Sequence, residues 1–291
     1  DVGGTVAFWR GDPTRVPADL AELHPTHLPA VPRVFEKIRT RALATAEDGG
    51  RLRRVGLAWA LGVGRRVRIA ERAGRPVGRL LAAEHRLADR LALARVRALF
   101  GPDLRLALTV AAPMPREVIE FFDACGVLIL EGYGLTETTA AGTLNTERAV
   151  RFGSVGRPLP GSEVAIAADG EIVLRGPHVF PGYHDDPAAT AAALSEDGWL
   201  RSGDLGRIDG DGYVHVTGRQ KDLIITSSGK NVSAANVEAA LREIRWVSQA
   251  VAYGDGRPYL VALLTLDPEE AGALADRVGA QTAAIPTLAA D

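Results

Sequence analysis

The amino-acid sequence predicts an α/β protein with one large domain and one smaller domain. Three patterns along the 291 residues support this prediction. Residues 35–100 have the apolar spacing of helices, residues 104–130 have a strand–helix–strand pattern, and residues 153–266 alternate short strands with turn signals. A chain of this length commonly forms about two domains and buries a sizeable core.

The composition excludes several classes of protein. Hydrophobic residues make up 46% and charged residues 24% of the chain, which excludes disordered and fibrous proteins. The single cysteine, Cys125, excludes a disulfide framework, and the six histidines lack metal-ligand spacing. No apolar run approaches the roughly 18 residues of a transmembrane helix, and no signal peptide is visible, so we expect a cytoplasmic protein.

The first hundred residues are predicted to be mostly helical. Prolines interrupt residues 1–33, which we expect to be loop with one short helix near Pro17–Leu23. Helices then follow from Phe35 to Phe100, where their apolar residues recur near the helical period, and they end at Gly101-Pro102.

Arginines concentrate in this helical segment. Residues 51–97 contain thirteen arginines and three acidic residues. The simplest interpretation is a solvated helical face. The alternative left open is contact with an anionic membrane, which would place the protein peripherally at the inner membrane surface. Nucleic acid is disfavoured because few aromatic side chains lie among the arginines to stack on bases.

The next segment predicts where a ligand binds. Leu104–Val110 and Val127–Leu130 are expected to be buried parallel strands, joined by a helix over Pro115–Ala124. Ligands of such βαβ units bind beyond the carboxyl ends of the strands. The residues that follow the second strand, Glu131–Thr139, are therefore the predicted binding loop.

The side chains of this loop suit a nucleotide. Gly132 and Gly134 let a planar ring approach the backbone, and Tyr133 can stack on such a ring. Thr136 offers a hydroxyl to a phosphate oxygen, and Glu137 is a carboxylate of the kind that Mg²⁺ binds. The alternative is a plain turn in which Thr136 caps the next helix.

The rest of the chain is predicted to contain short strands. The expected strands are 163–167, 171–174, 205–208, 213–216, 223–226, 247–253 and 259–266. Turns at Asp169-Gly170, Gly210-Asp211-Gly212 and Ser228–Asn231 separate neighbouring strands. A helix is expected to begin near Ser233, and an Ala-rich helical tail to follow Asp267.

Four sequence motifs occur in a distinctive order. They are EGYGLTETT at 131–139, GEIVLRG at 170–176 followed by GY at 182–183, GWLRSGDL at 198–205, and GRQKD at 218–222. Together they resemble the adenylate-forming (AMP-binding) superfamily of acyl-CoA synthetases, luciferases and peptide-synthetase adenylation domains, over essentially the whole chain. The run VPRVFEKI at 31–38 and the helical insert after it resemble the long-chain fatty-acyl-CoA synthetase branch.

The resemblance implies a partial adenylate-forming fold and a long-chain fatty acid–CoA ligase. Members of the superfamily use ATP and Mg²⁺ to convert a carboxylic acid into an acyl-adenylate and pyrophosphate, and then transfer the acyl group to coenzyme A. The implied small-molecule partners are therefore a fatty acid, ATP and CoA. A medium-chain or aryl-CoA ligase remains an alternative, as does a non-catalytic module that binds AMP or an acyl-adenylate.

The resemblance also implies a domain division. Residues 1–218 would be the C-terminal part of the large AMP-binding domain, including the helical insert at about 35–100 and a small β-barrel-like subdomain. Residues 222–291 would be a truncated small α+β domain. The hinge between the two would be residues 219–222, with Lys221 at the pivot between the two half-reactions.

Functional residues follow from the same motifs. Tyr133 would stack on adenine, and the wall of the adenine pocket would be Gly132, Gly134 and the backbone of Ala111, Ala112 and Pro113. Thr136 would contact the α-phosphate and Glu137 would bind Mg²⁺. Asp204 would accept both ribose hydroxyls, and Arg219 would reach the ribose or a phosphate. The coenzyme A tunnel would be lined by Ser228, Gly229 and Lys230.

The sequence departs from the family pattern in two places. The Ser/Thr/Gly-rich loop that ends in Pro-Lys-Gly and wraps the β- and γ-phosphates has no counterpart upstream of residue 131. None of the three lysines, Lys37, Lys221 and Lys230, matches the family's C-terminal catalytic lysine. The resemblance therefore implies a fragment with little or no ligase activity alone. Val110 stands where relatives commonly have glycine, which predicts a narrower pocket.

Overall fold

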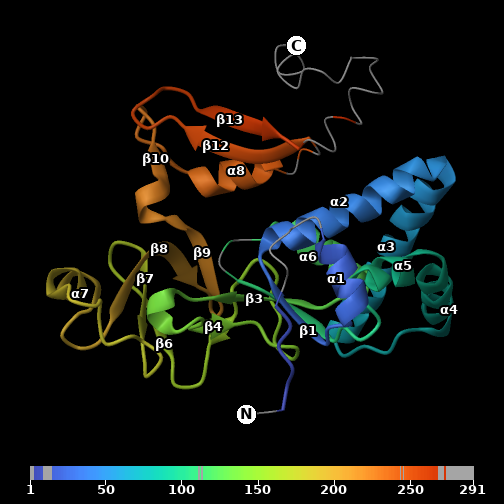
Figure 1. The fold of residues 1–291 in the computed structure, drawn as a ribbon, viewed down its shortest axis with the longest axis horizontal. Helices are drawn as coiled ribbons and strands as arrows, with labels where there is room; N and C mark the ends of the chain where they lie inside the picture. The colour runs from blue at the N-terminus through green and yellow to red at the C-terminus, as the bar shows by residue number, and fades with distance from the viewer. Residues whose placement is uncertain are drawn as a thin grey trace. The chain divides into compact units, whose positions relative to one another are not determined.

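Figure 1 shows the fold in a computed structural model, which describes residues 3–8, 15–110, 112, 114–242, 244, 246–267 and 272. Helices and strands both occur throughout these residues, which confirms the α/β class. Ala111, Pro113 and the tail expected after Asp267, Gly272 excepted, lie outside the described residues. The chain divides into two compact units. The first holds residues 1–164, 174–200 and 208–215, and the second holds 165–173, 201–207 and 216–291.

A five-stranded sheet organises the first unit. Its strands, in order across the sheet, are β1 (His27–Ala30), β2 (Leu106–Thr109), β3 (Ile129–Tyr133), β4 (Thr143–Leu144) and β5 (Arg157–Pro158). β1, β2 and β3 are parallel, and β4 pairs antiparallel with both β3 and β5. The predicted parallel pair of strands on either side of a helix is therefore confirmed.

The prediction of loop over residues 1–33 was wrong at β1, although the predicted short helix is confirmed. Pro29 lies inside β1 and pairs with Leu108 of β2. Proline usually argues against a strand because it has no N–H for the ladder. β1 lies at the edge of its sheet, where proline is tolerated.

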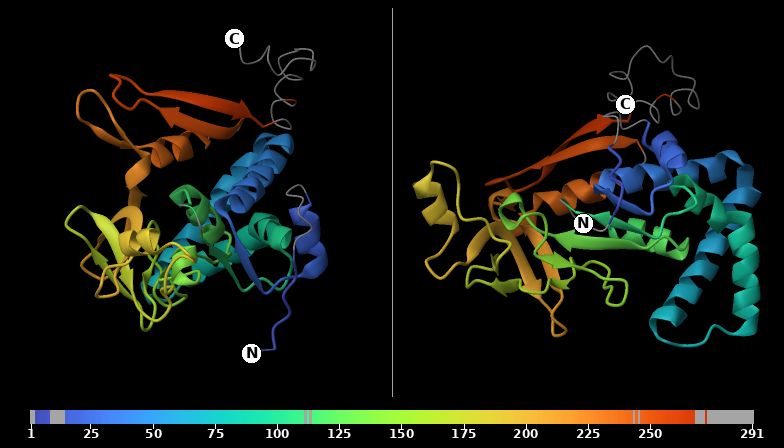
Figure 2. Two further views of the ribbon diagram at one scale, coloured as in Figure 1. Left: turned by 60° about the vertical axis from the view of Figure 1, so that its left-hand side comes forward. Right: turned by 60° about the horizontal axis from the view of Figure 1, so that its bottom comes forward.

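Helices account for most of the chain before β2. They are α1 (Val16–Leu23), α2 (Pro32–Asp48), α3 (Gly50–Arg72), α4 (Arg79–Ala88), a π-helical turn (Asp89–Leu93), α5 (Ala94–Arg97) and a 3₁₀ turn (Ala98–Phe100); α6 (Arg116–Ala124) connects β2 to β3. The long α3 and the shorter α4 lie side by side, as Figure 2 shows. Gly101 ends this segment with a φ of +88°, a left-handed conformation that glycine adopts without strain.

Three phenylalanines far apart in the sequence form part of the core of the first unit. Phe35 of α2, Phe100 and Phe122 of α6 have no exposed surface. Their ring centroids lie 5.2 to 6.3 Å apart. Gly64 of α3 lies so close to α6 that a Cβ there would sit 2.0 Å from the Ala124 carbonyl oxygen. This glycine therefore serves helix packing.

A second sheet follows in the chain. Its strands, in chain order across the sheet, are β6 (Glu163–Ile166), β7 (Glu171–Arg175), β8 (Leu200–Ile208) and β9 (Val214–Arg219), with α7 (Pro187–Ala193) between β7 and β8. These strands occupy the segment where a small barrel-like subdomain was expected. β8 begins at Leu200 rather than at residue 205. The Ser202-Gly203-Asp204 motif therefore lies in a strand and not before one.

The end of the second unit has the expected mixture of short elements. They are a 3₁₀ turn (Gln220–Asp222), β10 (Leu223–Ile225), β11 (Asn231–Ser233), α8 (Ala234–Arg242), β12 (Val247–Tyr253) and β13 (Val261–Leu266). β10 pairs antiparallel with β11, and β12 pairs antiparallel with β13. α8 lies along β12, as Figure 1 shows.

Ion pairs neutralise part of the arginine-rich segment. The pairs with acidic residues are Arg65–Glu120, Arg66–Glu84, Arg68–Glu71, Arg72–Asp123 and Arg97–Asp89. These contacts favour the solvated helical face for that part of the surface. Within the described ranges, no helix has both the length and the apolar character needed to cross a bilayer.

Candidate functional site

The predicted binding loop leaves β3 and turns at once into a one-turn 3₁₀ helix, Thr136–Thr138. The Thr138 hydroxyl oxygen accepts a hydrogen bond from the Leu135 N–H at 2.8 Å. Thr138 therefore caps this turn, and the alternative in which Thr136 is the N-cap is wrong because Leu135 occupies that position. The Thr136 side chain is exposed, which leaves its hydroxyl accessible to a ligand.

The two glycines of this loop have packing reasons of their own. A Cβ at Gly134 would lie 2.1 Å from the Ala140 carbonyl oxygen, so this position accepts only glycine without movement of the backbone. A Cβ at Gly132 would lie 2.9 Å from Leu144 Cδ1 and 3.5 Å from Val110 Cγ1. Val110 therefore covers part of the space above Gly132. Between these glycines, Tyr133 is only 8% exposed.

Glu137 is held by a tyrosine to which the sequence assigned no role. The Tyr183 hydroxyl donates a hydrogen bond of 2.8 Å to Glu137 Oε1, and this bond raises the pKa of Tyr183. The Phe180 N–H donates to the Glu137 carbonyl oxygen at 2.8 Å, and the rings of Phe180 and Tyr183 meet edge to face. The signal available was the Gly182-Tyr183 pair in the second motif.

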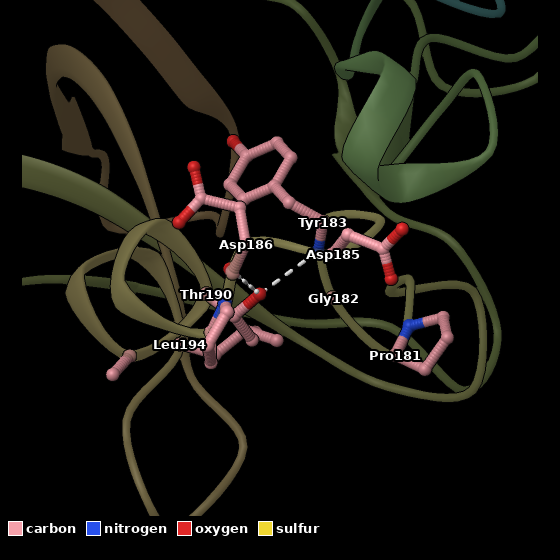
Figure 3. Close-up of a pocket in the computed structure, with 9 residues that line it drawn as sticks. Pro181, Gly182, Tyr183, Asp185, Asp186, Thr190 and Leu194 are labelled. Carbon is pink, nitrogen blue, oxygen red and sulfur yellow. Dashed lines mark hydrogen bonds between the residues drawn. The ribbon is translucent and has the colours of Figure 1, made fainter.

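Tyr183 also lines an open pocket of about 550 Å³. Figure 3 shows this pocket and the hydrogen bonds that shape it. The Tyr183 N–H donates to the Thr190 hydroxyl oxygen at 2.9 Å, and that hydroxyl donates to the Asp186 carbonyl oxygen at 2.8 Å. The backbone next to the tyrosine is therefore anchored to α7, while Tyr183 as a residue remains 40% exposed.

Glu131, directly before Gly132, is a second residue that sequence reasoning missed. The residue is 7% exposed, and burial raises the pKa of its carboxyl to about 7, although a hydrogen bond from the Gly153 N–H at 3.3 Å opposes the shift. Thr109 is paired with Glu131 across β2 and β3, and its buried hydroxyl has no hydrogen-bond partner among the residues that the structure describes. Two buried polar groups therefore lie under the start of the loop.

In the second unit, two residues from different motifs come together. The Asp204 side chain is 13% exposed, and its Oδ1 lies 3.4 Å from Arg219 Nε. The Arg219 side chain is 55% exposed, so its guanidinium can reach a ligand while it faces the carboxylate. A carboxylate accepts hydrogen bonds from hydroxyls, and a guanidinium donates to phosphate oxygens.

The remaining predicted residues lie on exposed turns of the second unit. Lys221 is exposed within the 3₁₀ turn after β9. Ser228, Gly229 and Lys230 form the turn between β10 and β11, where the Lys230 N–H donates to Thr226 Oγ1 at 3.2 Å. Gly229 has a φ of +77°, and a Cβ there would meet nothing within 4 Å. Its glycine is explained by backbone conformation and not by crowding.

The structure thus presents three groups of candidate residues. Gly132, Tyr133, Gly134, Thr136 and Glu137 share one loop of the first unit, and Ala112 is exposed just after β2. Asp204 and Arg219 face each other in the second unit, and residues 228–230 form a separate turn there. Among the described residues, no group of three or more His, Cys, Asp or Glu side chains gathers to hold a metal ion. Glu137 as a single carboxylate still suits Mg²⁺, which keeps most of its ligands as water and phosphate oxygens.

Two relatives with about 40% sequence identity to this chain are both fatty-acid–CoA ligases by name. The Mycobacterium tuberculosis protein fadD11 is 41% identical over 291 residues, which cover 99% of this chain and 51% of that protein. The long-chain-fatty-acid–CoA ligase FadD15 of Mycobacterium bovis is 40% identical over 251 residues, covering 86% of this chain and 41% of that protein. The chain therefore spans about half the length of the curated relatives it matches, or somewhat less.

Solved structures show the same fold. The adenylation domain of a carboxylate reductase from Mycobacterium chelonae matches 90% of this chain and 38% of that chain, with a TM-score of 0.66 at 23% identity. The O-succinylbenzoate coenzyme A synthetase of Bacillus subtilis, in complex with AMP, matches 57% of this chain and 37% of that chain, with a TM-score of 0.51 at 31% identity. A model for AMP-binding enzymes matches residues 2–184, and a model for the C-terminal domain of AMP-binding enzymes matches residues 221–287. The chain belongs to the family of AMP-binding enzymes.

Proposed function

We propose that the chain is part of a long-chain fatty-acid–CoA ligase. The whole protein would join a fatty acid to the α-phosphate of ATP with release of pyrophosphate, and then transfer the acyl group to the thiol of CoA. The observation that carries this proposal is the pairing of Asp204 with Arg219, 3.4 Å apart although they come from separate motifs. This pair offers an acceptor for ribose hydroxyls beside a donor for phosphate.

The loop after β3 supplies the other nucleotide contacts in this proposal. Tyr133 would stack on adenine, with Gly132, Gly134 and the backbone of residues 111–113 as the wall of the pocket. Thr136, whose side chain is exposed, would donate its hydroxyl to the α-phosphate. Glu137 would bind Mg²⁺, whose charge offsets the repulsion between an anionic carboxylate and an anionic phosphate. In such sites one well-placed donor lowers the barrier by about 3–4 kcal/mol.

The second half-reaction would use the end of the chain. We propose that residues 1–218 and 222–291 act as two domains, with a hinge at 219–222. Lys221 lies on a short exposed 3₁₀ turn between β9 and β10, a place where backbone angles can change without disturbing a core. The exposed turn of Ser228, Gly229 and Lys230 would line the path of CoA, with the Lys230 ammonium near a CoA phosphate.

The relatives favour a long-chain substrate over an aryl one. FadD15, named as a long-chain ligase, is 40% identical over 86% of this chain, whereas the O-succinylbenzoate synthetase is 31% identical over 57%. Because the chain spans about half the length of its relatives, we propose ligase activity for the whole protein and not for this part of it. For these 291 residues alone we propose AMP binding with little or no ligase activity.

ATP–pyrophosphate exchange tests the proposal. The whole protein should exchange labelled pyrophosphate into ATP when palmitate and Mg²⁺ are present, and benzoate should support much slower exchange. Exchange with benzoate alone would favour an aryl-CoA ligase. AMP binding without exchange for any acid would favour a non-catalytic binding module.

A contact with anionic lipid is a second candidate function for α3 and α4. Leu52 is 88% exposed beside Arg51 and Arg53, and Leu80 is 85% exposed beside Arg79. Exposed leucines flanked by arginines suit the surface of an anionic bilayer, at the inner face of the cell membrane. The protein should sediment with vesicles that contain phosphatidylglycerol, less so at high salt, and L52S/L80S should weaken the binding. Equal sedimentation with neutral vesicles would contradict an electrostatic contact.

A further inference from the structure

Glu171 is a buried carboxylate in β7, a strand whose other buried residues are apolar. It is 2% exposed, and its neighbours Ile172 and Leu174 in β7 are fully buried. Its Oε1 accepts a hydrogen bond of 2.6 Å from the Gly203 N–H. Its Oε2 forms an ion pair with the guanidinium of Arg201, two residues before Gly203. A buried charge is costly unless it is paired and hydrogen-bonded, so these two contacts explain why it is tolerated.

Ser202 holds the backbone of the residue that follows Gly203. Its hydroxyl donates to the Ile172 carbonyl oxygen at 2.6 Å and accepts from the Asp204 N–H at 3.1 Å. The N–H groups of Gly203 and Asp204 are therefore both bound to side chains that are themselves tied to β7. Gly203 has a φ of +74°, so β8 bends at this residue, and the two bonds fix the bend.

The fixed backbone at Gly203 determines where the Asp204 side chain begins. Its side chain leaves the backbone directly after the fixed bend, is 13% exposed and faces Arg219. A carboxylate that accepts two hydroxyls from one ribose must have its two oxygens oriented before the ligand arrives, because a poorly oriented carboxylate loses one of the two bonds. We infer that Glu171 and Ser202 are positioning residues that set the orientation of Asp204 toward the ribose. This inference rests on the proposed ribose contact of Asp204.

If β7 needed only a packed side chain at this position, a buried apolar residue would cost less free energy than the ion pair of Glu171. The exposed Asp169 provides a comparison, because its carboxylate accepts hydrogen bonds from Arg201 and from the Glu171 N–H, whereas the bond from the Gly203 N–H goes to the Glu171 carboxylate. Asp169→Asn removes the charge beside Arg201, keeps an oxygen that can accept from the Glu171 N–H, and leaves the bond between Glu171 and Gly203 in place. A role in orientation therefore predicts different effects for the two acids.

The test uses the preference of the 291-residue chain for AMP over 2′,3′-dideoxy-AMP, measured as the ratio of the two dissociation constants by calorimetry. The wild-type ratio should be about a hundredfold or more, since 2′,3′-dideoxy-AMP lacks both hydroxyls and each charge-assisted bond corresponds to about tenfold or more. Glu171→Leu should bring the ratio close to one, Glu171→Gln and Ser202→Ala should each lower it about threefold, and Asp169→Asn should leave it unchanged. A merely structural role would weaken both ligands equally and keep the ratio.

The outcomes separate this inference from the proposed function. If the wild-type chain shows no preference for AMP, or Asp204→Ala keeps the preference, the proposed ribose contact fails. If Asp204→Ala removes the preference while Glu171→Leu and Ser202→Ala retain the wild-type ratio, only the positioning inference is overturned. If Glu171→Leu does not fold by circular dichroism, Glu171→Gln and Ser202→Ala decide, and an unchanged ratio in both overturns it.

Discussion

The two carboxylates that the proposal assigns to ligand binding are held in different ways. Asp204 lies in strand β8, with its backbone fixed by Glu171 and Ser202. Glu137 lies on a single 3₁₀ turn, and its side chain accepts a hydrogen bond from the hydroxyl of Tyr183, a residue that is 40% exposed and lines an open pocket. An acceptor for a rigid ribose benefits from a fixed orientation, whereas a ligand for Mg²⁺ must move to meet a metal that arrives with its phosphates.

A buried acid in each of these two regions shows a similar difference. Glu171 is paired with the guanidinium of Arg201 and a peptide N–H. Glu131 accepts a longer hydrogen bond, 3.3 Å, from the neutral N–H of Gly153, and burial raises its pKa to about 7. The first carboxyl is held by a charged partner, whereas the second has a pKa of about 7, so its charge changes near neutral pH. The comparison predicts that the orientation of the Asp204 carboxylate is fixed before a ligand binds, whereas the Glu137 carboxylate changes its orientation when a ligand binds.

Replacing Asp204 by alanine should have the largest effect on binding. The substitution removes an acceptor for two ribose hydroxyls, each worth about 1.5–3 kcal/mol when the acceptor is charged. The affinity of the chain for AMP, measured by calorimetry, should fall by about a hundredfold or more. Asp211→Ala, on the exposed turn between β8 and β9, is a matched control that should leave the affinity unchanged. Unchanged affinity in Asp204→Ala would remove this residue from the site.

The loop that carries Glu137 should depend on Gly134 for its shape. A Cβ at Gly134 would lie 2.1 Å from the Ala140 carbonyl oxygen, so Gly134→Ala must displace the backbone. Such overpacking costs about 1–3 kcal/mol, and the midpoint of urea unfolding should fall accordingly. Gly210→Ala is the matched control, because a Cβ there would meet nothing within 4 Å. If both variants unfold at the same urea concentration, the loop accommodates the methyl group and its backbone is not fixed.

The sensitivity of Glu131 to pH gives a smaller effect on stability. Its folded pKa of about 7 lies above the unfolded value near 4.3, so the folded chain binds the proton more tightly. The resulting stabilisation is full below about pH 4.3 and is lost as the pH rises through about 7. Relative to Glu131→Gln, the wild-type chain should therefore lose about 2 kcal/mol of unfolding free energy between pH 5 and pH 8.

The control for this prediction is Glu117→Gln, which changes an exposed acid of α6. Thermal unfolding of the three proteins at a series of pH values provides the comparison. The Glu117 variant should follow the wild-type pH profile, and the Glu131 variant should be flatter. A Glu131→Gln profile parallel to wild type would mean that this carboxyl is not the group responsible.

The helices and strands were predicted from the sequence more completely than the contacts between them. Periodic apolar spacing placed the helices between Phe35 and Phe100, and the turn signals at 169–170 and 210–212 placed two connections of the second sheet, because these features are local. β1 was missed because Pro29 is a local signal against a strand, while its tolerance depends on an edge position that the rest of the sheet creates.

The same limit applies to the site. The motifs identified Asp204 and Arg219, but the 3.4 Å between them depends on how β8 and β9 run. Tyr183 and Glu171 were visible within motifs, yet their roles lie in hydrogen bonds to residues 46 and 32 positions away. The raised pKa of Glu131 depends on burial, which is decided by packing of the whole first unit. Residue type predicts chemistry, and only the fold shows which groups meet.

The smallest expected effect tests whether Glu137 adapts. Tyr183→Phe removes one hydroxyl and its 2.8 Å hydrogen bond to Glu137, on a side chain that is already 40% exposed. A neutral hydroxyl that is partly solvated contributes about 0.5–1.5 kcal/mol, so the Mg²⁺ concentration for half-maximal pyrophosphate exchange by the whole protein should change by about threefold.

The exchange rate of Tyr183→Phe at saturating Mg²⁺ should remain close to wild type. The control is Tyr259→Phe, which changes an exposed tyrosine of the second unit and should alter neither value. A loss of more than about a hundredfold in Tyr183→Phe would show that Glu137 needs a fixed orientation as Asp204 does, and the contrast between the two carboxylates would be wrong.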